Sequence, residues 1–324
     1  MMAGVKGGFA ISIDDVFAAH QRIADHIIRT PAIESERISN RLGCRVFFKA
    51  ENLQHAGAFK TRGAVNAVMS LNDEDARRGV VTHSSGNHAA ALARAAALRG
   101  IDAHVVMPEN SSPKKMAAVR SYGCEPVLCG PSTPEREAAA ESLRQKTGAT
   151  LIHPFETPAV MAGQGTVGIE LIDQIDSLDA ILVQVGGGGL LSGVLIAVKS
   201  LRPDIKVFAV EPELADDTAR SLKAGSPQSP TRYDTVADGL RTEVGANAFP
   251  IIRDLVDGIF LVKETAILAA MRLIAEEVHL VAEPSGAVSL AGLIDQAEQF
   301  QGQKVAVVIS GGNLSFGACT MGTH

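Results

Sequence analysis

The chain has 324 residues, which at about 150 residues per domain corresponds to roughly two domains and excludes a peptide or a disulfide-stapled miniprotein. It carries 30 Lys and Arg residues against 36 Asp and Glu residues, and this net charge of −6 argues against a nucleic-acid partner. Four cysteines without a C-x-x-C pair are too few for a disulfide framework, so we expect a cytoplasmic protein. Four glycines interrupt the one apolar run of membrane length, residues 180–198, so no membrane partner is expected.

Short runs rich in Val and Ile alternate with longer helical patterns along the whole chain. This order is typical of parallel strands joined by crossover helices. A helix is expected over residues 13–28, after Ser12 and with Asp15 in its first turn, and another opens at Thr133-Pro134 and stops near Gly148. The expected strands are residues 45–49, 80–83, 103–107, 126–129, 150–153, 180–185, 206–210, 259–262 and 304–309.

This order of elements predicts an α/β fold with doubly wound open sheets, in which ligands bind at the carboxyl ends of the strands. A closed eight-fold barrel has a similar strand count and stays open as an alternative. The four strands between residues 80 and 153 form a compact series. We therefore expect a smaller domain, residues 69–156, inserted into a larger one made of residues 1–68 and 157–324.

Three expected strands run directly into small, Gly-bearing turns. These are Ser84-Ser85-Gly86-Asn87-His88, then Gly186, Gly187, Gly188 and Gly189, and then Ser310-Gly311-Gly312-Asn313. Four consecutive glycines remove every Cβ atom, so their N–H groups can surround an anion at the positive end of the helix that follows. A phosphate is the natural ligand of this glycine bend, and a tight turn between sheet and helix is the plain structural alternative.

A nucleotide is one source of such a phosphate. The P-loop pattern is absent because no Lys-Ser or Lys-Thr follows the glycines at the required spacing, and the G-x-G-x-x-G register fails at Leu191 or Ser192. Glu211 nevertheless stands about 20 residues after the bend, where the ribose-binding acid of a dinucleotide fold belongs. A nicotinamide-dependent oxidoreductase therefore remains an alternative.

Lys60 lies among apolar and small residues, in the segment Ala58-Phe59-Lys60-Thr61-Arg62-Gly63-Ala64. Partial loss of hydration would lower its pKa and make its amine available for a Schiff base. A solvated surface lysine is the ordinary alternative, and spacing alone does not decide between the two.

The sequence resembles the fold-type II pyridoxal-phosphate enzymes, in the branch of serine/threonine dehydratases, 3-hydroxyaspartate dehydratases and serine racemases. The resemblance implies two open-sheet domains like those of the tryptophan synthase β subunit, the large one binding the cofactor and the small one closing over the substrate. It also implies a homodimer. It covers nearly the whole chain through motifs in the same order, namely Glu51-Asn52-Leu53-Gln54, Phe59-Lys60-Thr61-Arg62-Gly63-Ala64, the three Gly-bearing turns, Ala162-Gly163-Gln164-Gly165-Thr166, Ala237-Asp238-Gly239 and Glu283-Pro284.

The resemblance also implies roles for individual residues. Lys60 holds pyridoxal 5′-phosphate as a Schiff base and then removes the α-proton of the substrate. Ser85 lies on the opposite face of the α-carbon, where it could relay the proton of a racemase. The implied cofactor contacts are Gly186, Gly187, Gly188 and Gly189 to the phosphate, Phe59 on the ring, Asn87 to the ring hydroxyl, Ser310 at the pyridine nitrogen, and Glu283. The implied contacts to the substrate carboxylate are Ser84, Asn87 and His88.

A neutral Ser310 cannot keep a proton on the pyridine nitrogen as a carboxylate would, so the ring should be a weak electron sink and prompt loss of a β-hydroxyl is favoured. We therefore expect a dehydratase, or ammonia-lyase, for a small-molecule substrate. It would convert serine, threonine or 3-hydroxyaspartate to a 2-oxo acid and ammonia by α,β-elimination. Serine racemase is the alternative within enzymes, and a non-catalytic amino-acid-binding protein is an alternative outside them.

Arg136 stands in the first turn of a helix, where the helix dipole disfavours a cation. The resemblance implies that this arginine approaches the substrate in members that handle serine or hydroxyaspartate. A guanidinium suits a second carboxylate, which would favour 3-hydroxyaspartate over threonine.

Several oxygens follow the expected strand that ends near Glu211. The resemblance implies Mg²⁺, or Ca²⁺ or Mn²⁺, bound by Glu211, the Ala215 carbonyl and Asp217, whereas most acidic loops are simply solvated. Ala58 stands where the branch commonly has Ser, which leaves the substrate preference open. Among His55, His83 and His153, only His83 is expected to adjoin the site.

Overall fold

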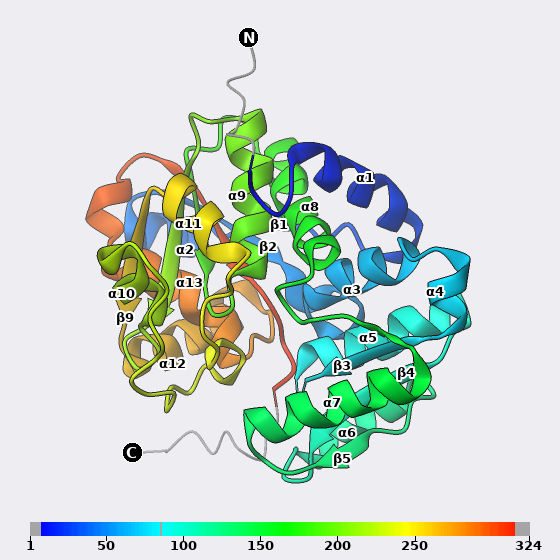
Figure 1. Cartoon of the computed structure of the whole chain (residues 1–324). Coiled ribbons are helices and arrows are strands. Elements are labelled where there is room, and N and C mark those ends of the chain that lie inside the picture. Colours follow the sequence, from blue (N-terminus) through cyan, green and yellow to red (C-terminus); the bar gives the residue numbers. More distant parts are fainter. Residues whose placement is uncertain (1–7, 85, 315–324) are drawn as a thin grey trace.

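The computed structural model describes residues 8–84 and 86–314, and the strands of this part of the chain form two separate sheets (Figure 1). The first sheet has six strands and the second has four. The strands are β1 (Ala32–Glu34), β2 (Arg45–Ala50), β3 (Val80–His83), β4 (Ala103–Pro108), β5 (Val127–Cys129), β6 (Thr150–Leu151), β7 (Ala180–Gln184), β8 (Lys206–Pro212), β9 (Gly258–Val262) and β10 (Lys304–Ile309).

The larger sheet has the order β1-β2-β10-β7-β8-β9 and is parallel except for the edge strand β1. Strand β10, the last strand of the described residues, lies in its interior, where Val305 pairs with Val46 on one side and with Ala180 on the other. The carboxyl ends of β2, β10 and β7 therefore meet at one edge of the sheet.

The smaller sheet has the order β5-β4-β3-β6, is parallel throughout, and lies at the lower right of Figure 1. Both sheets are open, with free edge strands, so the closed eight-fold barrel is wrong. The α/β fold with doubly wound open sheets is confirmed.

Helices cover both faces of each sheet, as the contacts between elements show. The helices are α1 (Ile13–Ile23), α2 (Glu36–Leu42), α3 (Lys60–Met69), α4 (Asp73–Arg77), α5 (Asn87–Arg99), α6 (Pro113–Arg120), α7 (Thr133–Thr147), α8 (Pro158–Gln174), α9 (Gly189–Leu201), α10 (Asp217–Ala224), α11 (Ala248–Leu255), α12 (Glu264–Leu273) and α13 (Pro284–Asp295). The larger sheet has α1, α8, α9 and α11 on one face and α2, α12 and α13 on the other. The smaller sheet has α5 and α6 on one face and α7 on the other. None of these helices is long and apolar enough to cross a membrane.

Strand β7 shows how the sequence builds this layered core. Every residue of the strand is buried, as expected for a parallel strand covered on both faces. Ile181 and Val183 belong to the apolar cluster under α8 and α9, whereas Ala180 and Leu182 belong to the cluster under α13. Successive side chains therefore point to opposite faces, and Gln184 points to the α13 face.

The first helix begins as expected and ends early. Ser12 and Asp15 form the reciprocal capping box at its start. The helix stops at Ile23 rather than at Ile28, and a 3-10 turn follows over Ala24–His26. Beyond that turn the Gln54 carboxamide bonds both the N–H and the C=O of Ile28, at 2.9 and 2.7 Å, which holds this backbone out of the helix.

A fully buried group of charges anchors the start of α3. The Arg62 guanidinium donates to both oxygens of Glu51, at 2.7 and 2.8 Å, and to both oxygens of Glu170, at 2.6 and 2.8 Å. Lys49 Nζ also donates to Glu170, at 2.5 Å. Each of these four side chains is 0–2% exposed, so the charges are compensated by one another and not by water.

Candidate active site

A cavity of about 1050 Å³ lies at the carboxyl ends of the strands of both sheets. The larger sheet contributes Ser310 after β10 and the glycine bend after β7, and the smaller sheet contributes His83 at the end of β3. Ligand sites of open α/β sheets are found at this edge. We call this space the central cavity.

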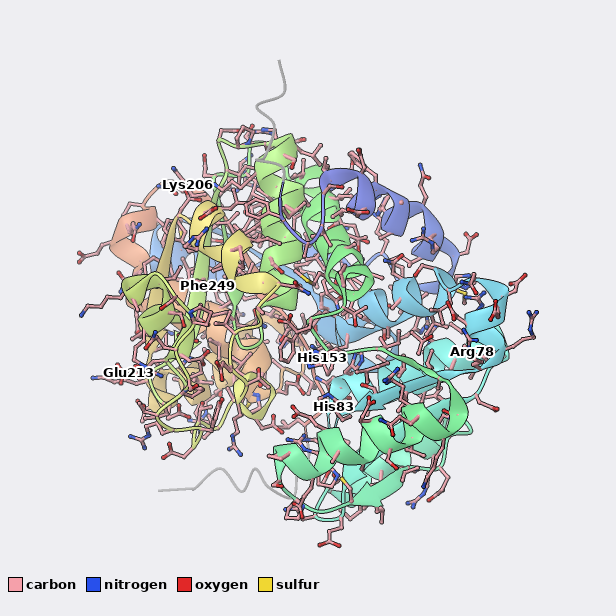
Figure 2. The ribbon with its side chains drawn as sticks, in the orientation of Figure 1. Arg78, His83, His153, Lys206, Glu213 and Phe249 are labelled. Carbon is pink, nitrogen blue, oxygen red and sulfur yellow. The ribbon has the colours of Figure 1, made fainter. Side chains whose placement is uncertain are left out.

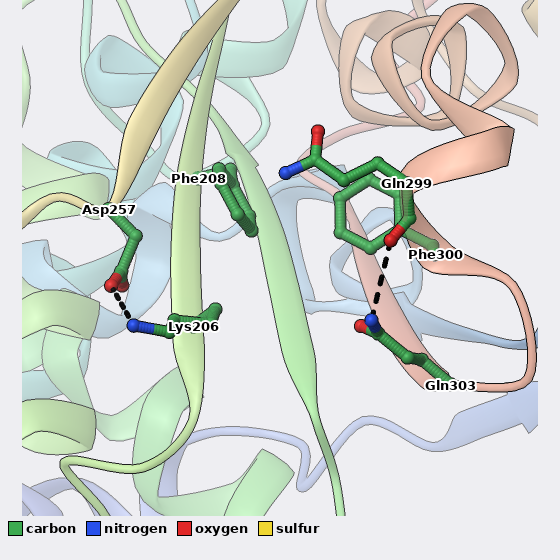
Figure 3. A pocket seen from close by; sticks show the side chains of 6 residues that line it. All are labelled: Lys206, Phe208, Asp257, Gln299, Phe300 and Gln303. Carbon is green, nitrogen blue, oxygen red and sulfur yellow. Dashed lines mark hydrogen bonds and ion pairs between the residues drawn. The ribbon is translucent and has the colours of Figure 1, made fainter.

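A second cavity, of about 250 Å³, lies at the opposite ends of strands β8 and β10 of the larger sheet (Figure 3). It is lined by aromatic rings and amides, and its cation Lys206 is paired with Asp257 at 3.0 Å. Its lining, as far as the described residues show it, includes no glycine bend and no unpaired amine. The central cavity is therefore the candidate active site.

Lys60 is the first residue of α3 and lines the central cavity. Its Nζ atom lies 2.9 Å from the carbonyl oxygen of Pro154 and 5.0 Å from the centre of the Phe59 ring. Loss of hydration lowers the pKa of Lys60 to about 8. A large fraction of this amine is thus unprotonated in mildly alkaline solution, as a nucleophile or a base requires.

The glycine bend joins β7 to α9, and the space that a Cβ would need there is already filled. A Cβ on Gly187 would lie 2.4 Å from the Phe155 ring, and one on Gly186 would lie 2.9 Å from the Cα of Leu240. Gly188 has a φ of +84°, which favours glycine. Within the described residues, the N–H groups of Gly186, Gly187 and Gly188 have no hydrogen-bond acceptor. They remain available to an anion at the start of a thirteen-residue helix.

The turn after β3 contributes polar groups to the central cavity through Ser84, Asn87 and His88, whereas Ser85 lies outside the described residues. The Asn87 amide donates to Glu283 Oε1 at 2.7 Å, and its carbonyl oxygen accepts from Asn313 at 2.9 Å. Asn87 is therefore fixed from two sides, and one Nδ2 hydrogen remains for a ligand.

His88 is buried and its Nε2 atom lies 3.2 Å from the carbonyl oxygen of Ile152. Burial and the nearby charge of Lys60 lower the pKa of His88 to about 3. The ring is therefore neutral at any ordinary pH and provides no positive charge for a carboxylate.

Glu283 and Ser310 stand on the α13 side of the central cavity. Glu283 precedes α13, and burial together with the charge of Asp238 raises its pKa to about 7. The Ser310 carbonyl accepts the Phe59 N–H at 3.0 Å, and Gly311 forms a β-bridge with Ala58. The turn after β10 is thus joined directly to the segment that carries the lysine.

His153 also lines the central cavity, so the expectation that only His83 adjoins the site is wrong. The two rings make an edge contact at 5.2 Å between centroids, and Figure 2 shows them close together. The Nδ1 atom of His153 accepts the N–H of Glu156 at 3.1 Å. Burial lowers the pKa of His153 to about 4, so this ring is neutral. Its place at the carboxyl end of the expected strand 150–153 was the sequence signal that pointed to the site.

Arg136 lies in the first turn of α7 and lines the central cavity from the side of the smaller sheet. The helix is capped by a reciprocal pair, Ser132 and Glu135. The charge of Arg136 contributes to lowering the pKa of His83, after the larger effect of burial. The arginine therefore stands beside the cavity face that carries His83.

The carboxylate of Glu211 is fully buried and does not line the central cavity. Its two oxygens accept the N–H groups of Thr218 and Ala219, each at 3.0 Å. Glu211 therefore cannot bind the ribose of a dinucleotide whose phosphates would lie at the glycine bend, and the nicotinamide-dependent alternative is wrong.

Asp217 lies beside Glu211 and is also buried. Its Oδ2 atom accepts the Val244 N–H at 2.8 Å, and its buried Oδ1 atom has no hydrogen-bond partner among the described residues. Burial raises the pKa of Glu211 to about 8 and that of Asp217 to about 6. Within residues 8–84 and 86–314 there is no cluster of three or more His, Cys, Asp or Glu side chains that could hold a metal. A cation here would need backbone or water oxygens as well.

The central cavity fits an aromatic aldehyde that carries a phosphate, because it combines a desolvated amine with a bend of unpaired N–H groups. A family model described as pyridoxal-phosphate dependent enzyme matches residues 23–311. A serine racemase of Oryza sativa subsp. indica is 43% identical over 315 residues, covering 96% of this chain and 93% of that protein.

A beta-hydroxyaspartate dehydratase of Paracoccus denitrificans (strain Pd 1222) is 44% identical over 301 residues, covering 93% of this chain and 96% of that protein. The solved structure of maize serine racemase is 43% identical, with a TM-score of 0.94 over 96% of each chain. The chain therefore belongs to the family of pyridoxal-phosphate dependent enzymes.

Proposed function

We propose that this protein is a dehydratase, or ammonia-lyase, that converts a 3-hydroxy amino acid into a 2-oxo acid and ammonia by α,β-elimination. The candidate substrates are serine, threonine and 3-hydroxyaspartate. The observation that carries the proposal is the Lys60 amine, with a pKa lowered to about 8, in the same cavity as the glycine bend. Relatives named as a beta-hydroxyaspartate dehydratase and an L-threo-3-hydroxyaspartate ammonia-lyase support the reaction class.

The residues that would hold the cofactor come from both sheets. Lys60 would bind it covalently, the N–H groups of Gly186, Gly187, Gly188 and Gly189 would bind its phosphate, and Phe59, Asn87, Glu283 and Ser310 would surround its ring. When bound, pyridoxal phosphate supplies an electron sink for the pair that remains when the α-proton leaves. Because Ser310 is neutral, this sink is weak, which favours early loss of the β-hydroxyl.

We assign the removal of the α-proton to Lys60. Lys60 Nζ accepts the α-proton of the substrate as a general base, and its lowered pKa suits this role near neutral pH. The Pro154 carbonyl, which accepts a hydrogen bond from that nitrogen, keeps it oriented.

Substrate binding would use the amino-terminal end of α5. Ser84, Asn87 and His88 would hold the α-carboxylate; since the His88 ring is neutral, attraction comes from N–H groups and the helix dipole. Arg136 would bind a second carboxylate, which favours 3-hydroxyaspartate over threonine. Ala58 is buried and presents no hydroxyl to the substrate or to the cofactor.

Serine racemase is the second candidate, favoured by the likeness to the rice and maize serine racemases. Ser85 would supply the proton on the face opposite Lys60. Following D-serine and pyruvate in one assay separates the two activities. A dehydratase yields mainly pyruvate, and a racemase yields mainly D-serine.

A divalent cation, Mg²⁺ or else Ca²⁺ or Mn²⁺, would bind Glu211, the Ala215 carbonyl and Asp217. The unpartnered, buried Oδ1 atom of Asp217 supports this proposal. The cation would act on the central cavity indirectly. Asp217 holds the N–H of Val244, and the next residue, Gly245, donates to the Gly187 carbonyl at 3.2 Å.

Three organisational features complete the proposal. The small domain would comprise residues 69–156 and the large domain residues 1–68 and 157–324. The protein would be a homodimer, which sedimentation velocity can test. It would act in the cytoplasm, in keeping with free thiols at Cys44, Cys124 and Cys129.

The proposal is tested on the purified protein. It should carry a chromophore that borohydride fixes to Lys60, as peptide mapping would show, and this result would exclude a non-catalytic amino-acid-binding protein. Serine, threonine and the four stereoisomers of 3-hydroxyaspartate should then be screened with and without magnesium for 2-oxo acid. Appreciable 2-oxo acid formation by Lys60→Ala would contradict the proposed role of the lysine.

A further inference from the structure

The last residue of β7, Gln184, places a buried amide in the wall of the central cavity. The side chain is 3% exposed. Its Oε1 atom accepts a hydrogen bond from the Ser289 hydroxyl of α13 at 2.7 Å. Its Nε2 atom is buried and has no hydrogen-bond partner in the described part of the chain.

An unpaired amide at this position is costly for the fold itself. A buried donor without an acceptor loses the hydrogen bonds it would make to water, whereas an apolar side chain of the same size would lose nothing. Gln184 points to the same face as Leu182, which belongs to the apolar cluster under α13. A hydrogen-bond acceptor that enters the central cavity would satisfy this amide.

The arrangement of three neighbouring strands indicates which end of a ligand this amide meets. Lys60 lies beyond β2, Ser310 follows β10, and Gln184 ends β7, in the order of the sheet. Helix α13 contacts both the turn that contains Ser310 and the side chain of Gln184. A Cβ on Gly286 would lie 2.6 Å from the Gly311 carbonyl, so the helix packs against the turn of Ser310, and Ser289 stands one helical turn further on.

Resting on the proposed function, we infer that Gln184 is a cofactor-positioning residue whose Nε2–H group donates to the ring nitrogen of bound pyridoxal phosphate, directly or through one water. The phosphate would occupy the glycine bend two residues further along, and Asn87 stands on the side of the smaller sheet. The ring nitrogen is then the acceptor left for the α13 side of the cavity.

This donor has a chemical consequence. A ring nitrogen that carries a proton is itself a donor, so it would face the Gln184 N–H unfavourably. A neutral nitrogen accepts that hydrogen bond. Gln184 thus favours the unprotonated nitrogen through an orientation fixed by Ser289, while the neutral Ser310 adds no negative charge that would hold a proton there.

Two substitutions test the inference. Gln184→Met keeps the length and removes the hydrogen bonds, and it should raise the Kd for pyridoxal phosphate about 3- to 10-fold. The melting temperature of the cofactor-free protein should stay unchanged or rise, while the increase on adding the cofactor becomes smaller. Gln184→Glu should alter the pH dependence of the absorption of the bound cofactor, because a carboxylate stabilises a protonated ring. Gln21→Met, on the exposed face of α1, is the matched control and should change none of these.

The outcomes separate the inference from the proposed function. If borohydride still fixes the cofactor to Lys60 and Gln184→Met leaves its Kd unchanged, the inference alone is wrong. A fall in the melting temperature of the cofactor-free Gln184→Met protein, with no loss of cofactor affinity, would show that Gln184 is merely structural. A wild-type protein that takes up no cofactor at Lys60 would overturn both.

Discussion

The Nζ atom of Lys60 donates a hydrogen bond to the carbonyl oxygen of Pro154 at 2.9 Å, which joins the start of α3 to the segment between β6 and α8. The carbonyl accepts more strongly from the protonated amine than from the neutral one, but this single hydrogen bond compensates only part of the hydration lost on burial. Burial therefore dominates, and the pKa of Lys60 falls to about 8.

The first prediction concerns the reactivity of this amine in the cofactor-free protein. Only the unprotonated amine attacks an aldehyde, so the rate of pyridoxal uptake should rise with pH and level off above about pH 8, not above the usual lysine value of about 10.4. Absorbance changes after mixing with pyridoxal measure this rate. Lys60→Arg should show no such step. A wild-type rate that still rises steeply between pH 9 and pH 10 would contradict the lowered pKa.

The same pKa gives the second prediction, for stability. The folded pKa of about 8 lies below the unfolded value of about 10.4, so the unfolded chain binds more protons between these two pH values. The contribution of Lys60 to the free energy of unfolding should therefore increase as the pH rises through this window. Urea titrations of the cofactor-free protein and of Lys60→Met measure it as a difference. An equal pH slope for both proteins would count against this prediction.

The third prediction concerns the buried charges beside the lysine. Arg62→Met would leave Glu51 and Glu170 without their main partner, and it should lower the free energy of unfolding by about 3–5 kcal/mol. Arg78→Met, which removes an exposed arginine near the edge of the molecule in Figure 2, should leave it nearly unchanged. Urea denaturation compares the two. A similar decrease in the free energy of unfolding for both variants would show that burial of the arginine does not determine the size of the decrease.

The fourth prediction concerns substrate choice. If Arg136 binds the second carboxylate of 3-hydroxyaspartate, Arg136→Met should lower kcat/KM for that substrate about 10- to 100-fold and for serine less than about 3-fold. Arg144→Met, at an exposed position of the same helix, should change neither value. Equal losses for both substrates would indicate that Arg136 has no role in their discrimination.

The fifth prediction concerns the cation. Saturating magnesium or calcium should raise the melting temperature by roughly 5 °C, and a chelator should reverse the effect. Asp217→Asn should abolish the increase. Glu213→Gln, at an exposed position near the left edge of Figure 2, should retain it. A melting temperature that responds to the cation equally in all three proteins would rule out the proposed ligands.

The strands were predictable where burial alone determines them and less so where pairing does. The runs at Val80–His83 and Lys304–Ile309 are apolar because both faces are covered, and their bounds agree with expectation. Strand β1 was missed, since Ala32–Glu34 is short and half-exposed and exists only because β2 offers it an edge. The expected strand 150–153 ends at Leu151, because the ring of His153 accepts backbone N–H groups that follow it and turns the chain.

The candidate site was predictable in composition but not in orientation. Small residues in the glycine bend indicated a close approach, yet the sequence could not show that Phe155 and Leu240 provide it, because both lie far away in the chain. Glu211 lies near the carboxyl end of β8, where a ribose-binding acid would stand. Its carboxylate turns instead toward N–H groups at the start of α10, a choice that depends on tertiary packing.

The interior position of β10 has a consequence for how the protein is made. The larger sheet cannot close until Lys304–Ile309 has left the ribosome, because β2 and β7 are joined only through this strand. The smaller sheet needs nothing beyond Leu151 for its own strand pairing. During synthesis, the smaller sheet can therefore form its side of the central cavity long before the larger sheet forms the other side. The larger sheet, which positions Lys60, forms only after nearly all of the described residues have been synthesised.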